Sequence, residues 1–251
     1  MKIIQLFGMV MLAGFISHHA QANVCENKTL LGQTLNKTQF SSEDDLYACK
    51  LLPHENNTAL LAVAEFVPHV EEEYEGDYAL HLFKANAKTG QILKKYLNMD
   101  TFISDAVALR GIEIDTAAYQ LNSRLRAIGV RTQYEGGSRV YPYNNSTLHL
   151  YDLENKKTLL TGLVVDLYRG ENDTRCNSEW EEHRGVLHML NNKTNGFADI
   201  RMTINIKSEG MHMVKGECED LPTKQDKVSF ILKYDGKTYR VPKPFSETYV
   251  Y

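Results

Sequence analysis

Apolar residues recur in four runs of strand length along the middle of the chain, between residues 111 and 168. Short segments rich in Gly, Asn, Ser and Lys separate the runs, and such residues are typical of turns. We therefore predict a β-meander, in which each strand pairs with the next one along the chain. The four runs are Gly111–Leu121, Arg124–Tyr134, Thr147–Leu153 and Thr158–Tyr168.

Three further segments have the pattern of β-hairpins, with an apolar run on either side of a turn signal. Gly90 stands where the first turn needs a positive φ, Asn195-Gly196 marks the second turn, and Asp235-Gly236 marks the third. The predicted hairpins span Tyr78–Leu97, Gly185–Gly210 and Val228–Pro242.

The remaining segments have weaker patterns. Thr58–Val67 is continuously apolar and predicts a buried strand that ends at Pro68, although a short helix would have the same composition. Asn23–Phe40 is polar and predicts an irregular arm, Arg169–Arg184 predicts a long polar loop, and Met211–Cys218 predicts a strand.

The hairpins also resemble one another, because His81, His149 and His188 each stand between two apolar residues of a predicted strand. Such a His is expected on the face opposite its apolar neighbours, half-exposed and structural. Equivalent strand positions, at residues 80, 148, 187 and 231, are separated by 68, 39 and 44 residues, and two of these three gaps are near the length of a propeller blade. The alternative to a true repeat is that hairpins of any all-β protein resemble one another in this way. We predict an all-β antiparallel meander of hairpins, either a propeller-like array or a β-sandwich, in one domain over residues 23–251 with an N-terminal arm at 23–57.

The first residues have the pattern of a secretory signal peptide. Lys2 precedes the mostly apolar segment Ile3–Ile16, and Ala20 and Ala22 provide the small residues of a cleavage site. We predict that residues 1–22 are removed, with an uncleaved anchor as the alternative. No later run is long and apolar enough to span a membrane, so we expect a periplasmic or secreted protein.

Four cysteines would remain after cleavage, and an even number in an exported protein predicts two disulfides. Three pairings are open, and we favour the one in which each disulfide closes its own end of the chain. A zinc site is the alternative, but no CxxC or HxxxH spacing supports it. The favoured pairs are Cys25 with Cys49 and Cys176 with Cys218.

Candidate chemistry is sparse along the chain. The net charge is −4 with no long basic cluster, so we do not expect nucleic-acid binding. No GxSxG motif occurs, and both disulfides together would leave no free thiol, so we expect no catalytic residue and no enzymatic activity. The alternative is an envelope hydrolase or a cation-dependent enzyme that uses either of two acidic segments with His, namely His69–Asp77 or Glu179–His188.

Surface recognition is the chemistry that the residue types favour. Tyr, Trp and Arg are enriched in binding hot spots because they offer large contact areas at a low entropic cost. The loop before the third meander strand carries three such residues, and the only Trp stands beside a His in a polar segment. The candidate binding residues are Arg139, Tyr141, Tyr143, Trp180 and His183.

Two segments resemble known proteins. Ile114–Arg131 and Lys193–Met202 resemble parts of uncharacterised secreted proteobacterial proteins, a resemblance that implies export and no particular activity. Residues 191–202 are also similar to the FG-GAP element of integrin-type propellers, whose calcium loop normally carries several acids. Only Asp199 is acidic here, so we expect no cofactor and keep calcium as the alternative.

These observations together lead us to expect an exported, non-enzymatic protein that binds another macromolecule, most simply a protein of the cell envelope. An immunity or inhibitor protein would have these properties. A structural envelope protein without a tight ligand is the remaining alternative.

Overall fold

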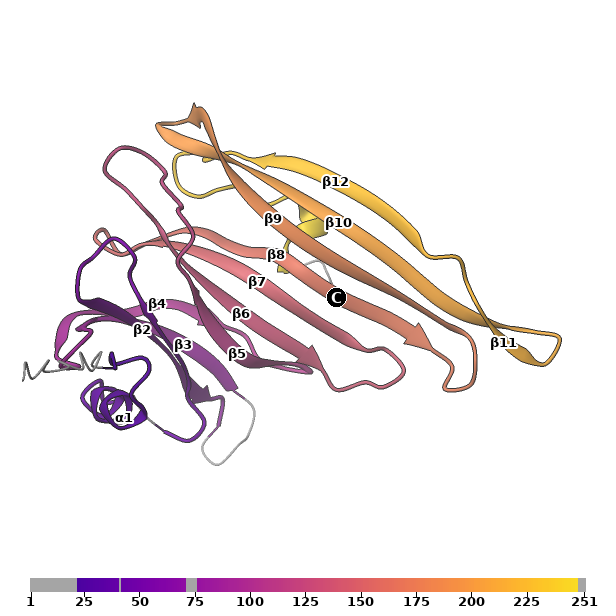
Figure 1. The fold of residues 1–251 in the computed structure, drawn as a ribbon, viewed down its shortest axis with the longest axis horizontal. Coiled ribbons are helices and arrows are strands. Elements are labelled where there is room, and N and C mark those ends of the chain that lie inside the picture. The colour runs from indigo at the N-terminus through magenta and orange to yellow at the C-terminus, as the bar shows by residue number, and fades with distance from the viewer. Residues whose placement is uncertain (1–21, 41, 71–75, 248–251) are drawn as a thin grey trace, which may run out of the picture.

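The computed structural model describes residues 22–40, 42–70 and 76–247, so almost all of the predicted leader lies outside the described residues. Within these ranges two antiparallel sheets form, and one α-helix packs against the smaller sheet (Figure 1). The small sheet contains β1 (Leu46–Leu51), β2 (Thr58–Pro68), β3 (Gly76–Asn86) and β4 (Ile92–Phe102). The large sheet contains β5 (Val107–Asp115), β6 (Ile128–Gly136), β7 (Tyr143–Asp152), β8 (Lys157–Asn172), β9 (Ser178–Thr194), β10 (Phe197–Val214), β11 (Glu217–Asp220) and β12 (Lys224–Leu232).

The strands follow one another across each sheet in chain order. The small sheet has the order β1-β2-β3-β4, and the large sheet runs from β5 to β11, with β12 returning to pair with β10. Every one of these pairings is antiparallel. The prediction of an all-β antiparallel meander of hairpins is therefore confirmed.

The two sheets face each other across a shared hydrophobic core. Leu60 and Leu80 of the small sheet belong to the same buried cluster as Ile114, Val130 and Tyr134 of the large sheet. Among the described residues the strands divide into sheets of four and eight, rather than into repeated four-stranded blades. The sequence left a propeller-like array and a β-sandwich open, and the two packed sheets correspond to the sandwich.

Strand β2 is buried on both of its faces, which explains why its sequence is continuously apolar. Leu60 and Ala62 face the large sheet, whereas Leu61 and Val63 belong to a separate cluster on the other side. The helix α1 (Lys28–Asn36) covers this second side through Leu35.

The irregular arm predicted at the N-terminus is therefore wrong over α1. The Asn27 side chain caps the helix by accepting a hydrogen bond of 3.0 Å from the Leu30 N–H. The helix buries only Thr34 and Leu35, so it has too narrow an apolar stripe to be recognised from periodicity. No helix in the described part of the chain is long and apolar enough to cross a bilayer.

The C-terminal segment (residues 233–247) packs against an edge of β8 that β9 leaves open. β9 pairs with β8 only over Asp166–Asn172. Further along β8, the Tyr239 N–H donates to the Leu159 carbonyl at 2.8 Å, and Ser246 forms an isolated bridge with Leu163. In Figure 1 the yellow C-terminal segment, with the 3₁₀ turn η1 (Lys243–Phe245), accordingly lies beside β8.

This packing corrects the hairpin predicted over Val228–Pro242. The turn at Asp235-Gly236 forms, with Gly236 at a φ of 103°, but only the bridge between Tyr234 and Tyr239 flanks it. β12 pairs with β10 instead of with the segment after the turn. Tyr239 is buried in a further core cluster, together with Leu159 and Ile200 of the large sheet, so tertiary packing prevails over the local hairpin signal.

The other two turn predictions are confirmed. Gly90 has a φ of 63° between β3 and β4. Asn195 and Gly196 have φ values of 49° and 83° between β9 and β10, the paired positive angles of a type I′ hairpin.

Two further predictions are wrong at the far end of the large sheet. The expected loop over Arg169–Arg184 consists mostly of strand, with only residues 173–177 between β8 and β9. The expected strand over Met211–Cys218 is a hairpin, in which Lys215 and Gly216 turn the chain from β10 into β11. This end projects beyond the core, so both faces carry polar residues and the alternation typical of a half-buried strand is missing.

Two disulfides close the ends of the chain, and their pairing is the one favoured from the sequence. Cys25 pairs with Cys49 and so ties the start of the chain beside α1 to β1. Cys176 pairs with Cys218 and joins the turn after β8 to β11 at the projecting end. Disulfides of this kind are typical of proteins that fold in an oxidising compartment.

The three histidines of the related strands differ in their surroundings. His81 and His149 are buried, whereas His188 is exposed. The His81 ring stacks on Phe40 with ring centroids 4.0 Å apart, and its Nε2 lies 3.0 Å from Glu65. The expectation of half-exposed histidines is therefore wrong for two of them, because the second sheet and the arm cover the face on which they lie.

Candidate binding groove

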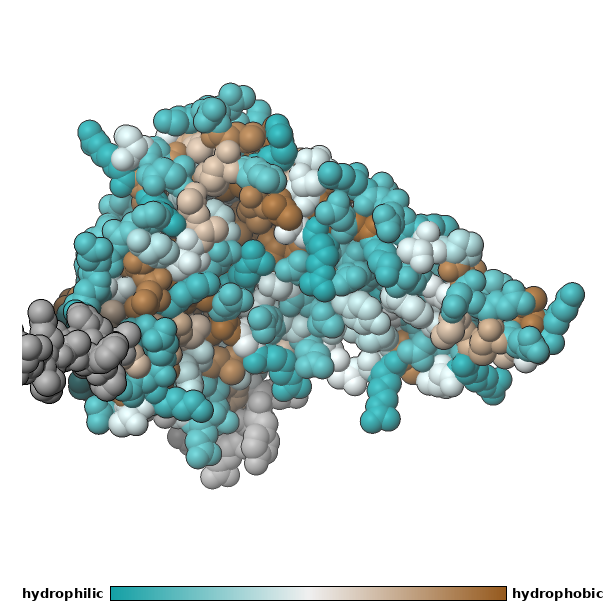
Figure 2. Space-filling view, viewed as in Figure 1, coloured by the Kyte–Doolittle hydropathy of each residue, from teal (hydrophilic) through white to brown (hydrophobic). Residues whose placement is uncertain are grey.

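Strands β8, β9 and β10 extend beyond the core and form the projecting end of the molecule (Figure 1). Figure 2 shows that hydrophilic residues cover most of this end on the visible face. The segment before β7 runs along the same end, because the Gly170 and Asn172 N–H groups donate to the carbonyls of Pro142 and Val140. These hydrogen bonds continue the register of Tyr143 with Arg169, so Tyr141 lies opposite Glu171.

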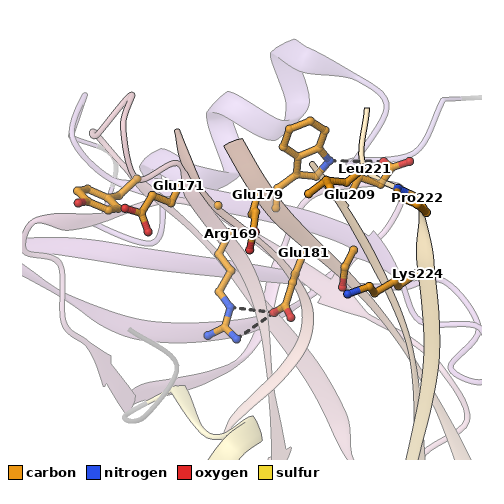
Figure 3. A pocket seen from close by; sticks show the side chains of 12 residues that line it. Arg169, Glu171, Glu179, Glu181, Glu209, Leu221, Pro222 and Lys224 are labelled. Atoms are coloured by element: carbon orange, nitrogen blue, oxygen red, sulfur yellow. Dashed lines mark hydrogen bonds and ion pairs between the residues drawn. The ribbon is translucent and has the colours of Figure 1, made fainter. Parts of the chain in front are cut away.

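A hollow of about 640 Å³ lies on this projecting end, within the size range of ligand sites. We call it the groove, and Figure 3 shows it from close by. Aromatic, acidic, basic and apolar side chains all contribute to its walls. Its lining residues are Tyr141, Arg169, Gly170, Glu171, Glu179, Trp180, Glu181, Ser208, Glu209, Leu221, Pro222 and Lys224.

Strand register arranges most of the lining in two rows across the sheet. In the first row Glu171 lies directly opposite Glu179, which in turn lies opposite Gly210. In the second row Arg169 lies opposite Glu181, and Ser208 continues that row to Lys224. Residues two apart on a strand share a face, so both rows point to the same side of the sheet.

Two of the groove's carboxylates have partners. Arg169 donates to Glu181 Oε2 from Nε at 3.1 Å and from its terminal nitrogen at 2.9 Å (Figure 3). Glu209 lies 2.8 Å from the Lys207 ammonium and accepts a hydrogen bond from the Trp180 indole at 3.4 Å. The hydrogen bond from Lys207 is the main cause that lowers the pKa of Glu209. Both acids are therefore held within the protein's own network.

Glu171 and Glu179 differ from those two acids. Within the described residues, neither carboxylate has an ion-pair or hydrogen-bond partner. They are directly opposite each other on neighbouring strands, an arrangement in which like charges are destabilising. The groove thus contains an unneutralised pair of acids beside Tyr141.

The structure places the predicted binding residues in three different settings. Tyr141 and Trp180 line the groove, and the Tyr141 side chain is 59% exposed. Arg139 is exposed outside the lining, with its carbonyl accepting a hydrogen bond from the Asn172 side chain at 2.6 Å. Tyr143 is partly buried against Val164 and Leu167, and burial raises its pKa to about 12.

His183 is the fifth predicted residue, and it lies on β9 next to the groove. Its Nε2 is 3.5 Å from Glu181, and burial lowers the pKa of the imidazole. No local pattern marks Arg169, Glu171 or Lys224 as binding residues, because only the pairing of strands shows that they lie in adjacent rows. Glu179 could be predicted only as part of the acid–base segment Glu179–His188.

That acid–base segment does not converge on one point. Glu179, Glu181 and His183 share one face of β9, whereas Glu182 and Arg184 point to the other face. The second acidic segment, His69–Asp77, lies partly outside the described residues, and its described ends meet at 3.4 Å between His69 and Asp77.

Metal ligands do not gather in the described part of the chain, where no group of three or more His, Cys, Asp or Glu side chains is placed to hold an ion. In the FG-GAP-like element Asp199 is buried, and the Asn195 side chain donates to the Tyr234 carbonyl at 2.9 Å. That Asn therefore stabilises the packing of the C-terminal segment.

One buried constellation has the residue types of a hydrolase site. His149 Nδ1 lies 3.1 Å from the Thr161 hydroxyl and 3.9 Å from Asp100. The imidazole is buried between the sheets, and burial lowers its pKa to about 3. A substrate cannot reach these atoms in this conformation, so the constellation contributes to packing.

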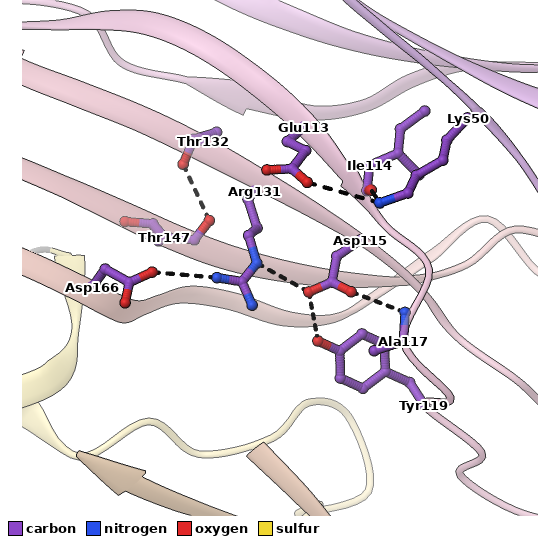
Figure 4. Close-up of polar contacts among 10 residues, drawn as sticks. All are labelled: Lys50, Glu113, Ile114, Asp115, Ala117, Tyr119, Arg131, Thr132, Thr147 and Asp166. Atoms are coloured by element: carbon purple, nitrogen blue, oxygen red, sulfur yellow. Dashed lines mark hydrogen bonds and ion pairs between the residues drawn. The ribbon is translucent and has the colours of Figure 1, made fainter. Parts of the chain in front are cut away.

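The charged groups of a network on β5, β6 and β8 find their partners within the network itself (Figure 4). Arg131 donates to Asp115 at 3.0 Å and to Asp166 at 3.4 Å, and the Tyr119 hydroxyl donates to Asp115 at 2.9 Å. Burial by itself would raise the pKa of Asp115, but hydrogen bonds from Ala117, Tyr119 and Arg131 lower it overall. This network anchors the chain between β5 and β6, in contrast to the open acid pair in the groove.

Comparison of this chain with protein-family models, with curated proteins and with solved structures finds no match. The geometry of the groove is therefore the basis on which its function is inferred.

Proposed function

We propose that this chain is an exported bacterial protein, periplasmic or secreted, that binds another macromolecule through the groove and catalyses no reaction. The leader pattern and the two disulfides support export. An immunity or inhibitor protein acting in the cell envelope would have these properties.

The groove on the projecting end is the observation that carries this proposal. Tyr141 and Arg169 are residue types that dominate binding energy in protein interfaces, and both belong to the rows that face the groove. They are attached to paired strands and to a segment hydrogen-bonded to β8, so little conformational entropy is lost when a partner binds.

Binding is favoured over hydrolysis by the placement of the reactive side chains. The His149 constellation is buried. On β9, Glu179, Glu181 and His183 share one face, whereas Glu182 and His188 lie on the other. The hollow also contains the Ser208 hydroxyl, directly opposite Glu181, but among the described residues this hydroxyl makes no hydrogen bond to a base that would activate it.

A capture experiment tests this function. The mature chain, residues 23–251, is fixed to a resin, exposed to cell-envelope extract and culture supernatant, and the retained proteins are identified by mass spectrometry. We expect one stoichiometric partner, which Tyr141→Ala and Arg169→Ala each retain less well.

Two exposed residues away from the groove provide matched controls. Tyr47 is 56% exposed, close to the 59% of Tyr141, and Arg110 has an exposed side chain paired only loosely with Glu135 at 4.0 Å. Tyr47→Ala and Arg110→Ala should capture the partner like the wild type. An empty resin, or equal retention by groove and control variants, would contradict the proposal.

A further inference from the structure

We propose that the groove binds a Lys or Arg side chain of an extended segment of the partner protein, with the cationic group between Glu171 and Glu179. This inference rests on the proposed function and specifies the chemistry of the partner.

The first argument is the charge that the groove leaves unbalanced. Its lining contains four glutamates but only two cations, Arg169 and Lys224. Arg169 is bound to Glu181, and Glu209 is held by Lys207, which lies outside the lining. Lys224 lies in the other row, on β12, and forms no ion pair with these acids. Glu171 and Glu179 therefore have no ion-pair partner among the described side chains, and the groove keeps a net negative charge.

The second argument is the position of these two charges. Directly opposite residues on antiparallel strands have Cβ atoms about 4.5–5.5 Å apart. Two carboxylates on side chains that start this close together repel each other, and a single ammonium or guanidinium between them would be attracted by both. A bound cation thus removes a repulsion that the free protein contains.

The third argument concerns the walls beside the acid pair. Tyr141 lies opposite Glu171 with its ring exposed, and the apolar side chains of Leu221 and Pro222 line the same hollow. A cation is attracted to the face of an aromatic ring, and Lys and Arg have long apolar stems that pack on such surfaces. The groove therefore offers separate surfaces for the stem and for the charged head.

A divalent metal fits the groove less well than a cationic side chain. Calcium takes six to eight oxygen ligands, whereas Glu171 and Glu179 provide two carboxylates, and no cluster of three ligands occurs among the described residues. The hollow of about 640 Å³ is also much larger than one ion and has room for a segment of chain.

The test uses defined probes and nuclear magnetic resonance. ¹⁵N-labelled mature protein is titrated with blocked trilysine and triarginine peptides, with blocked triglutamine as the neutral control and calcium chloride as the metal control. We expect saturable shifts of the amides around residues 141, 171 and 179 with the two cationic peptides, weakened by added salt. Triglutamine and calcium should leave these amides unmoved.

Matched variants locate the binding to the acid pair. Glu171→Gln with Glu179→Gln keeps the size and removes both charges, and it should weaken binding of the cationic peptides about fivefold or more. Glu217→Gln with Glu219→Gln is the control, because it also removes two exposed negative charges, which lie on one face of β11 outside the groove lining. Equal weakening by both pairs, no shift with either cationic peptide, or a calcium response at residues 171 and 179 would overturn the inference.

The capture experiment distinguishes failure of this inference from failure of the proposed function. If Tyr141→Ala abolishes capture of the partner while Glu171→Gln with Glu179→Gln retains it, the groove binds a partner but not through a cation. If neither change alters capture, the groove is not the binding surface and both proposals fail.

Discussion

The hydroxyl of Tyr151 donates a hydrogen bond of 2.9 Å to Asp100, and this bond joins β7 of the large sheet to β4 of the small one. Tyr151 is fully buried, and its ring lies in the core cluster between the sheets. The contact is polar at the centre of an apolar interface, so it fixes how the two sheets are aligned.

We expect Tyr151→Phe to lower the free energy of unfolding by about 2 kcal/mol, because the change removes the hydrogen bond and leaves the carboxylate without this donor. Urea unfolding followed by tryptophan fluorescence and circular dichroism measures the loss. Tyr47→Phe is the control and should have no effect, since Tyr47 is exposed on β1.

A double-mutant cycle with Asp100→Asn tests whether the two residues act together. The effects of the single changes should add to more than the effect of the double change, because each one breaks the same bond. Strict additivity would show that Tyr151 stabilises the protein through packing alone.

The C-terminal segment places a second carboxyl near this interface. A Cβ built on Gly162 would lie 3.4 Å from the Cβ of Glu247, so that side chain packs closely on β8. Burial raises the pKa of Glu247 and also that of Asp100, and the negative charge of Asp100 raises the pKa of Glu247 further. Because the pKa of Glu247 is higher in the folded than in the unfolded state, its neutral form stabilises the folded protein at low pH. This stabilisation is lost as the pH rises through the folded-state pKa.

We therefore expect Glu247→Gln to melt at a higher temperature than the wild type at neutral pH and at the same temperature near about pH 3. Gln retains the size of Glu and an oxygen that accepts hydrogen bonds. Thermal unfolding followed by circular dichroism at both pH values measures the difference. Glu219→Gln, on exposed β11, should behave like the wild type at both. A variant that melts like the wild type at neutral pH would mean that Glu247 is not disfavoured there.

The meander could be predicted from the sequence, because strand patterns and Gly or Asn turns depend on residues that are close together along the chain. Helix α1 and the strands of Arg169–Arg184 escaped prediction, since α1 buries only two side chains and the projecting end has no buried face. Tyr141 and Trp180 could be selected by residue type. The opposition of Glu171 and Glu179 depends on strand register, which no local pattern determines.

The two disulfides should differ in their effect on global stability. In the chain-entropy model, loops closed by separations of 24 and 42 residues stabilise by about 3.5 and about 4 kcal/mol respectively. Cys25–Cys49 ties the start of the chain to β1, beside the core cluster under α1, whereas Cys176–Cys218 lies at the projecting end. We expect Cys25→Ser with Cys49→Ser to reduce global stability by roughly the full amount.

Removal of the second disulfide should act locally, because the projecting end contributes little to the core. Cys176→Ser with Cys218→Ser should increase amide hydrogen exchange at residues 173–177 and 211–220 while the melting temperature falls less than in the first pair. Equal falls in the two double variants would contradict this division between core and projecting end.

Gly185 allows a test of how closely β9 packs beside β8. A Cβ at this position would lie 2.5 Å from the Val165 carbonyl oxygen, a backbone atom that cannot move aside, and 2.2 Å from the Met202 side chain. We expect Gly185→Ala to destabilise the protein by about 1–3 kcal/mol, as overpacking in a core does. Gly137→Ala is the matched control, because nothing lies within 4 Å of its Cβ position, and it should be neutral or slightly stabilising. Urea unfolding of both variants measures the contrast, and a neutral Gly185→Ala would mean that β8 and β9 lie further apart at this point.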